Sequence, residues 1–316
     1  MFFDYIPINL ETVLINSILN FDLYIYYREN NSYRLYRSKN TPFNMQEKNT
    51  LIENNVKTLF INAEDYESYN LYIEQNLGII IDNPAIDTES KANIIYESAR
   101  NLMENVIENP VAGNAIRRSQ EFVGNTVKYI ISEKDYFFNM INLTSHDYYT
   151  YTHSINVCIY SLSLARKIGI NDSNKLNEIG TGALLHDIGK SAIPRDILLK
   201  KGPLTEYEWV IMKEHPDRGV RLLKEHSDRL SYESENIVRL HHEKLDGTGY
   251  PLGLKGGDIS QCVRIVCIAD IFDALNTNRP YKRAADTFHS LEIMNDQFYG
   301  KIDQFLFKDF ICLFKK

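Results

Sequence analysis

The sequence predicts a mainly α-helical protein in which a small α+β domain precedes a larger all-α domain. The chain has 316 residues, which is long enough for two domains that each bury a core. Strand-like runs rich in tyrosine and β-branched residues are confined to the first 82 or so residues. From there to the C-terminus, apolar residues recur mostly at helical intervals. We therefore expect an α+β domain over residues 1–83, a helical linker over 84–140 and an all-α domain over 141–316.

Residues 23–27 and 33–36 flank a polar stretch, and this pattern predicts a β-hairpin. A third strand is expected over residues 58–61. Apolar side chains then recur at helical spacing over residues 66–77, and Gly78 is expected to end that helix. This domain contains no catalytic constellation and no cofactor fingerprint. We interpret it as a regulatory or dimerisation module.

The helical region begins after Pro84. Thr88 is a candidate N-cap for a first helix, and a second helix is expected over residues 111–131. Polar breaks at residues 171–173 and 246–249 separate later helices. The helices between the two domains can transmit a signal or pair with their copy in a homodimer, although their apolar repeats are too short to predict a coiled coil.

Charge and hydropathy exclude several classes of protein. The formal net charge is −7 and the pI is about 5.7, so the field of the whole protein repels nucleic acid polymers and anionic lipid surfaces. No window supplies the roughly 18 apolar residues that a membrane span needs, and the N-terminus lacks a basic n-region. The four cysteines lack the paired spacing of zinc or redox sites, so we expect them in the core. The sequence therefore predicts a cytoplasmic protein without a membrane span or a nucleic acid partner.

Histidines and aspartates cluster in the second half of the chain. A lone histidine on a helix is more often an ordinary core or surface residue than a metal ligand, but a group of them reverses that expectation. The candidate metal ligands are His153, His186, Asp187, His215, His241, His242 and Asp270. Imidazole and carboxylate suit iron, manganese, nickel or zinc, whereas the lack of thiolate partners argues against a structural zinc site.

His186 and Asp187 are adjacent, and this spacing constrains their geometry. Successive helical residues point about 100° apart, so the two side chains can face two neighbouring metal ions, with Asp187 as the bridging ligand. Two such cations can lower the pKa of a water nucleophile and neutralise the charge that builds on a phosphoryl oxygen, as phosphodiester hydrolysis requires. Lys190 follows closely, and its ammonium can protonate or stabilise the leaving oxygen. The alternative is a solvated lysine at a helix end.

Four motifs in this region occur in the order and spacing of a known family. They are His186 to Lys190 (HDIGK), His215-Pro216, His241 to Pro251 (HHEKLDGTGYP) and Ala269 to Leu275 (ADIFDAL). Together they resemble an HD-GYP domain, a branch of the HD superfamily of metal-dependent phosphohydrolases, over about residues 141–316. An isolated His-Asp pair would be weak support, but the long third motif makes the resemblance specific.

The resemblance implies a fold, an activity and roles for individual residues. It implies an all-α HD-type helical domain that hydrolyses cyclic di-GMP to pGpG, with GMP as a further product. One metal would be held by His153, His186, Asp187 and Asp270, and a second by Asp187, His215, His241 and His242. In such domains the residue matching Lys190 assists catalysis, and the residues matching Tyr250, Arg279 and Lys282 contact the dinucleotide. Taken alone, Arg279 and Lys282 could equally belong to a plain basic surface loop.

One position departs from the family pattern. Some relatives carry a glutamate four residues before the first histidine, where it helps to bind a third metal, and this chain has Tyr149 there. We therefore predict two divalent ions, iron or manganese, with nickel and zinc as alternatives. Glu243 is interpreted as a partner that orients a ligand histidine, because its place beside two ligands points it away from the metals.

Three functions stay open on the sequence alone. The leading one is hydrolysis of cyclic di-GMP. A second is hydrolysis of another cyclic dinucleotide or a nucleotide, and a third is a receptor or protein-interaction module that binds without turnover. All seven ligand positions are filled and Lys190 is present, which favours an enzyme.

Overall fold

The computed structural model describes residues 5–110, 114–133, 136–144, 150–226, 230–277 and 286–315. The chain folds into two compact units, Met1–Ser98 and Ala99–Lys316. The boundary falls inside helix α3 (Thr88–Glu108). The three segments expected from the sequence, with boundaries after residues 83 and 140, stay predictions.

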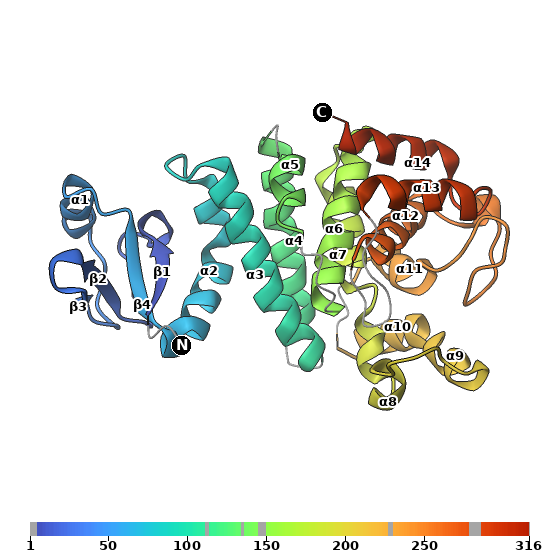
Figure 1. Cartoon of the computed structure of the whole chain (residues 1–316), viewed down its shortest axis with the longest axis horizontal. Coiled ribbons are helices and arrows are strands. Elements are labelled where there is room, and N and C mark those ends of the chain that lie inside the picture. The colour runs from blue at the N-terminus through green and yellow to red at the C-terminus, as the bar shows by residue number, and fades with distance from the viewer. Residues whose placement is uncertain are drawn as a thin grey trace. The chain divides into compact units, whose positions relative to one another are not determined.

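The first unit contains a small antiparallel sheet and two complete helices (Figure 1). The strands are β1 (Tyr5–Asn9), β2 (Leu23–Tyr27), β3 (Ser32–Arg37) and β4 (Thr58–Asn62), and the helices are α1 (Met45–Glu53) and α2 (Tyr66–Asp82). The strand order is β1-β4-β2-β3. This arrangement confirms the expected small α+β domain.

Alternation along β4 explains how the sheet uses its aromatic residues. Leu59 and Ile61 are fully buried on one side. Phe60, between them, points to the other side, where its ring lies 5.0 Å from that of Tyr33. Tyr33 in turn stacks on Tyr5 at 4.1 Å. The two periodic faces of the strand thus separate an aliphatic core from an aromatic layer.

Several local expectations for this unit are confirmed or corrected. The hairpin of β2 and β3 and the strand at residue 58 are confirmed. The expected helix end at Gly78 is wrong, because Ile80 and Ile81 continue the buried face and outweigh the propensity cost of about 1 kcal/mol for one glycine. Thr88 is not an N-cap. It is the first residue of α3, and Asp87 accepts the backbone N–H of Ser90 at 2.8 Å instead.

All regular secondary structure in the described residues of the second unit is helical, apart from an isolated β-bridge. After the end of α3, its α-helices are α4 (Ala115–Ser132), α5 (Tyr136–Ile141), α6 (Thr150–Lys167), α7 (Ser173–Leu185), α8 (Arg195–Leu198), α9 (Glu206–Met212), α10 (His215–His226), α11 (Tyr232–Leu240), α12 (Gln261–Asn276), α13 (Thr287–Gln297) and α14 (Gln304–Ile311). Its 3-10 helices are η4 (Ile188–Ala192), η5 (Gly256–Asp258) and η6 (Cys312–Phe314). The expected helix over residues 111–131 corresponds to α4, and residues 111–113 lie outside the described part. The expected all-α fold is confirmed.

The core of the second unit is built around α6, which packs against both α7 and α12 (Figure 1). Helix α12 is buried along most of its length, and it carries Cys262 and Cys267. Cys158 is also buried, whereas Cys312 is half-buried, and all four thiols are free. Three of the cysteines are therefore core residues, as expected. Among the described residues, no helix combines the length and the apolar character needed to cross a bilayer.

A glycine brings η4 against α10. A Cβ atom at Gly189 would lie 1.9 Å from the carbonyl oxygen of His215 and 2.5 Å from the backbone nitrogen of Gly219. Only glycine permits this approach without a shift of the backbone. The packing fixes the start of α10 next to the end of α7, and the site is assembled at this point.

Candidate metal centre

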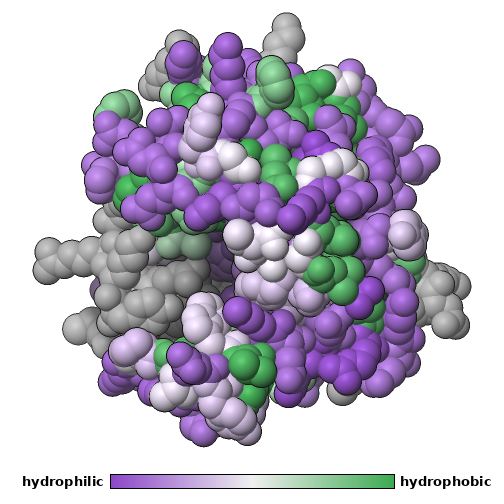
Figure 2. Space-filling view, turned by 90° about the vertical axis from the view of Figure 1, so that its right-hand side faces the viewer, coloured by the Kyte–Doolittle hydropathy of each residue, from purple (hydrophilic) through white to green (hydrophobic). Residues whose placement is uncertain are grey.

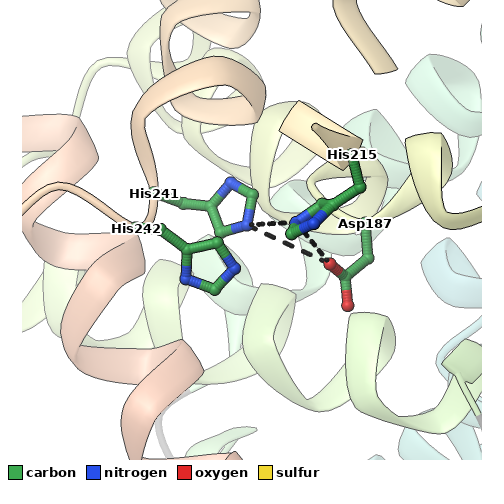
Figure 3. Close-up of side chains that lie close together, drawn as sticks. All are labelled: Asp187, His215, His241 and His242. Atoms are coloured by element: carbon green, nitrogen blue, oxygen red, sulfur yellow. Dashed lines mark hydrogen bonds and ion pairs between the residues drawn. The ribbon is translucent and has the colours of Figure 1, made fainter. Parts of the chain in front are cut away.

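All seven candidate ligands converge inside the second unit, although they come from five separate segments. His153 lies within α6, His186 and Asp187 follow α7, His215 opens α10, His241 and His242 follow α11, and Asp270 lies within α12. Their ligand atoms form two groups, each within 4.8 Å. One group contains His153, His186 and Asp270, and the other contains Asp187, His215, His241 and His242, which Figure 3 shows.

Asp187 lies between the two groups and points one carboxylate oxygen at each. Its Oδ2 lies 3.4 Å from the Nε2 of His186 and 3.6 Å from that of His153. Its Oδ1 lies 3.4 Å from the Nε2 of His215 and 4.0 Å from that of His241, as the dashed lines in Figure 3 indicate. The side chain therefore has the geometry of a bridging ligand.

Helix ends orient three of the histidines in the same way. The last carbonyl groups of a helix have no partner inside the helix, and each of these rings uses one three residues earlier. The Nδ1–H groups of His186, His215 and His241 donate to the carbonyl oxygens of Ala183, Met212 and Val238 at 2.6, 2.8 and 2.9 Å. A carbonyl can only accept, so each Nδ1 carries the proton and each Nε2 presents a lone pair to the centre.

His153 is oriented differently because it lies inside a helix, where the carbonyl groups are already used. Its Nδ1 hydrogen-bonds to Oδ2 of the buried Asp273 at 2.7 Å, and Asn156 donates to the other oxygen at 2.9 Å. Asp273 lies within the fourth sequence motif, but its role was not predicted. Its spacing of three residues from Asp270 on a helix was the available indication, because such residues share one face.

Burial keeps two of the histidines in the form that binds metal. Burial lowers the pKa of His215 to about 4, and burial together with the charges of neighbouring histidines holds the pKa of His241 well below its usual range. Burial alone would raise the pKa of Asp187, but Lys190 and His186 hold it well below its usual value. Near neutral pH this half of the centre therefore combines neutral imidazoles with an ionised carboxylate, which metal coordination requires.

The other half concentrates negative charge around one histidine. Burial alone would lower the pKa of His153, but its hydrogen bonds with Asp270 and Asp273 raise it to about 10. Burial alone would likewise raise the pKa of Asp270, yet His153 and His242 hold it well below its usual range. The Nε2 of His153 lies 3.2 Å from Asp270 Oδ1. These surroundings attract a positive charge, which either a proton or a cation can supply.

The donor set fits a divalent metal ion. The Nε2 atoms of His215 and His241 lie 3.4 Å apart, and each presents a lone pair because its Nδ1 holds the proton. The Oδ1 of Asp187 is buried and receives no hydrogen bond from the described residues. Three lone pairs therefore converge with no hydrogen between them, an arrangement that is costly unless a cation shares it.

Two further candidate residues lie beside these ligands. Lys190 is half-buried, and its Nζ forms an ion pair with Oδ2 of Asp187. The ring of Tyr250 lies 4.6 Å from that of His242 and 6.4 Å from that of His215. Both residues therefore lie beside candidate ligands, and the roles expected for them stay predictions.

Glu243 serves the loop rather than a ligand histidine. Its buried carboxylate accepts the backbone N–H groups of Leu252, Gly253 and Leu254 at 2.7, 3.1 and 3.0 Å. The expectation that Glu243 orients a histidine is therefore wrong, because its acceptor capacity is used by the main chain. A Cβ atom at Gly249 would lie 2.4 Å from the backbone nitrogen of Lys244, so this loop also packs tightly against the segment that carries His242.

Some candidate residues lie outside the described part of the chain. Arg279, Lys282 and Tyr149 belong to this group, so their expected roles stay predictions.

A buried set of histidines and aspartates, carried within and at the ends of packed helices, defines an all-α domain with a candidate metal centre. A family model described as HD domain matches residues 135–306, which is more than half of the chain, and the chain therefore belongs to the HD domain family. A solved structure of an HDG"Y"P protein from Bdellovibrio bacteriovorus has the same fold, with a TM-score of 0.65, 23% identity and coverage of 99% of this chain and 100% of that chain. The resemblance to HD-GYP domains is thereby confirmed.

Three curated relatives carry names of activities. A cyclic di-GMP phosphodiesterase of Pseudomonas aeruginosa is 31% identical over 222 residues, which are 70% of this chain and 53% of that protein. A 3'3'-cGAMP-specific phosphodiesterase of Vibrio cholerae is 40% identical over 155 residues, 49% of this chain and 33% of that protein. A cyclic di-GMP phosphodiesterase of Thermotoga maritima is 34% identical over 181 residues, 55% of this chain and 49% of that protein. This chain thus spans about half or less of the length of these relatives.

Proposed function

We propose that this protein is a metal-dependent phosphodiesterase that hydrolyses cyclic di-GMP to pGpG, with GMP as a further product. The observation that carries the proposal is Asp187, which points one oxygen at each of two histidine groups. The names of the relatives from Pseudomonas aeruginosa and Thermotoga maritima support the same substrate.

The proposed centre holds two divalent ions. The first is assigned to His153, His186, Asp187 and Asp270, and the second to Asp187, His215, His241 and His242. When bound, such ions supply a nucleophile near neutral pH and neutralise charge on the phosphoryl oxygens. Imidazole and carboxylate ligands favour iron or manganese, and nickel and zinc are also compatible. Six of these seven side chains are buried in the described structure, which excludes competing water from their lone pairs.

The protein contributes proton transfer and binding groups. Lys190 is placed beside Asp187, so its ammonium can donate a proton to the leaving oxygen or stabilise its charge. Tyr250, against His242, can contact the dinucleotide. We assign Arg279 and Lys282 to the same task from the resemblance, since an acidic protein needs local cations to attract phosphates.

A second substrate is 3'3'-cGAMP. The observation that favours it is the 40% identity with a Vibrio cholerae phosphodiesterase specific for that dinucleotide. Both substrates present the same type of phosphodiester to the centre, so the ligands described above serve either one.

The setting of the activity is also part of the proposal. We place the protein in the cytoplasm, where a cyclic dinucleotide messenger would be its substrate. Residues 1–83 are assigned a regulatory or dimerisation role, and a homodimer formed through the helical segment 84–140 would connect two copies.

Anaerobic metal analysis combined with turnover assays tests this function. The wild type is expected to hold two divalent ions per chain and to linearise cyclic di-GMP, with 3'3'-cGAMP assayed in parallel, whereas Asp187→Ala should lose both properties. A wild type that holds two metals and binds the dinucleotide without cleaving it would establish a receptor and overturn the proposal.

A further inference from the structure

A row of aromatic and cationic side chains extends outward from the metal centre. The ring of Tyr250 lies against that of His242 at 4.6 Å with an interplanar angle of 32°. The Nζ of Lys213 lies 5.7 Å from the centroid of the Tyr250 ring and 6.0 Å from that of Trp209. Each step is within or at the range of a ring or cation–π contact. The row therefore connects a candidate ligand to the surface of α9.

The outer end of this row is an exposed indole. Trp209 leaves 49% of its surface to solvent, although a ring of this size gains strongly from contact with another apolar face. Trp209 lies within α9, and Lys213 is the C-cap residue of the same helix. Residues four apart on a helix are neighbours, so the two side chains lie side by side. Figure 2 shows the side of the molecule that lies at the right in Figure 1, where hydrophobic residues are scattered among hydrophilic ones. On α9, Tyr207 and Val210 are also exposed, at 75% and 61%.

Helix α9 is coupled to the centre through its last residue. The carbonyl oxygen of Met212 accepts the Nδ1–H of His215 at 2.8 Å, and this bond orients the histidine. Trp209 and Lys213 are therefore fixed relative to His215 by a short segment of chain.

Lys213 carries a charge that no carboxylate neutralises in the described structure. Two cations of this region form ion pairs, Lys200 with Glu208 and Arg218 with Glu214. Lys213 forms no ion pair with any described residue and instead faces two aromatic rings. An exposed ammonium between ring faces is suited to a ligand that is both anionic and planar.

We propose that Trp209 and Lys213 form a nucleotide subsite, in which the indole stacks on a purine base and the ammonium contacts a phosphate of the same ligand. The inference rests on the proposed phosphodiesterase function and extends it to the base. Stacking on an aromatic ring is tolerant of base identity. The subsite therefore binds guanine and adenine alike, which allows cyclic di-GMP and 3'3'-cGAMP to share it.

The chain has one tryptophan, so its fluorescence reports directly on this position. The full-length protein is titrated with a hydrolysis-resistant phosphorothioate analogue of cyclic di-GMP, and inorganic phosphate serves as the comparison. Saturable quenching by the analogue, with none by phosphate, supports stacking on Trp209. Binding of the analogue by calorimetry with no change in fluorescence overturns the subsite.

Substitutions separate the indole from the rest of α9. Trp209→Ala is expected to raise the Kd for the analogue and the KM roughly 5- to 100-fold, with kcat and metal content little changed. Trp209→Phe should restore most of the affinity. Tyr207→Ala is the matched control, because Tyr207 is 75% exposed on the same helix and lies about 200° around it from Trp209. Equal effects at positions 207 and 209 overturn the assignment.

The role of the charge has its own variant pair. Lys213→Met should raise the KM and Kd and weaken their dependence on salt, whereas Lys213→Arg should keep both near the wild-type values. Unchanged binding in Lys213→Met overturns the phosphate contact. A protein that quenches on binding but does not cleave the dinucleotide refutes the phosphodiesterase function while supporting the subsite. If Trp209→Ala and Lys213→Met cleave the dinucleotide with wild-type KM and kcat, the phosphodiesterase function is supported and the subsite is refuted.

Discussion

Each unit contains a cluster of buried polar atoms, and the two clusters differ in how their atoms are paired. In the first unit, the hydroxyl of Tyr72 accepts the backbone N–H of Leu14 at 2.8 Å, and the hydroxyls of Tyr69 and Thr12 lie 3.2 Å apart. In the second unit, Asp187 Oδ1 receives no hydrogen bond from the described residues, and histidine lone pairs converge beside it. Buried polar atoms that hydrogen-bond to one another stabilise the fold. Buried acceptors that converge without a donor instead create a site for a cation.

The largest predicted loss of activity is at Asp187, which lies between the two histidine groups. Removing an outer partner of a metal ligand typically costs 10- to 100-fold, so Asp187→Asn, which removes a bridging charge, is expected to lower turnover by at least about 100-fold. Metal content should fall in parallel, measured by elemental analysis. Asp296→Asn, on the exposed surface of α13, is the control and should keep both properties. Full metal content in Asp187→Asn would contradict the bridging role.

A smaller loss of metal affinity is expected at Asp273, which does not belong to the candidate ligands but hydrogen-bonds to one of them, His153. Asp273→Asn removes the negative charge that accepts the Nδ1–H of His153, so metal affinity should fall about 10- to 100-fold. A competitive chelator titration measures the affinity of wild type and variant. Unchanged affinity would show that His153 keeps its orientation without this carboxylate.

Packing between η4 and α10 gives a stability prediction for the second unit alone. Gly189→Ala places a methyl group on the backbone of His215, and overpacking of this kind costs about 1–3 kcal/mol. Denaturant unfolding followed by the fluorescence of Trp209 reports on this unit. Gly202→Ala is the matched control, because a Cβ there meets nothing within 4 Å. Equal midpoints for the two variants would show that the backbone yields at Gly189 without cost.

The smallest expected effect is on the stability of the first unit at alkaline pH. Burial raises the pKa of Tyr69 to about 12, so folding favours the neutral phenol. Its contribution is fully present below pH 10, the usual pKa, and is lost as the pH rises through about 12. Tyr69→Phe should therefore flatten the decline of stability between pH 10 and 12, measured by denaturant unfolding with circular dichroism. The control is Tyr299→Phe, an exposed ring in the second unit, and an identical flattening there would refute the assignment.

The sequence identified the side chains that converge at the candidate centre, but it did not identify the groups that orient them. Adjacent His186 and Asp187, within a series of motifs, were sufficient to indicate a shared metal site. The carbonyl groups that orient the histidines were not predictable, because every residue has one and only the helix end leaves it free. Glu243 was assigned wrongly for a similar reason, since its partners are main-chain N–H groups.

The same limit applies to the fold. Helical periodicity identified the second unit, because its long helices bury continuous apolar faces. Helix α1 (Met45–Glu53) was not expected, and among its described residues only Lys48 and Leu51 are buried, so its periodic pattern is weak. Its start is fixed by Asn44 and Glu47 in a capping box, which is a local interaction rather than a core face.

The bonds that Glu243 accepts leave the loop around Tyr250 anchored through its main chain. Such an anchor does not depend on which side chains the loop carries at positions 252 and 254, since any residue with a backbone N–H can be held in the same way. The shape of the loop and its chemical character are thus controlled separately. Selection for a different ligand could change the surface of this loop without rebuilding its path.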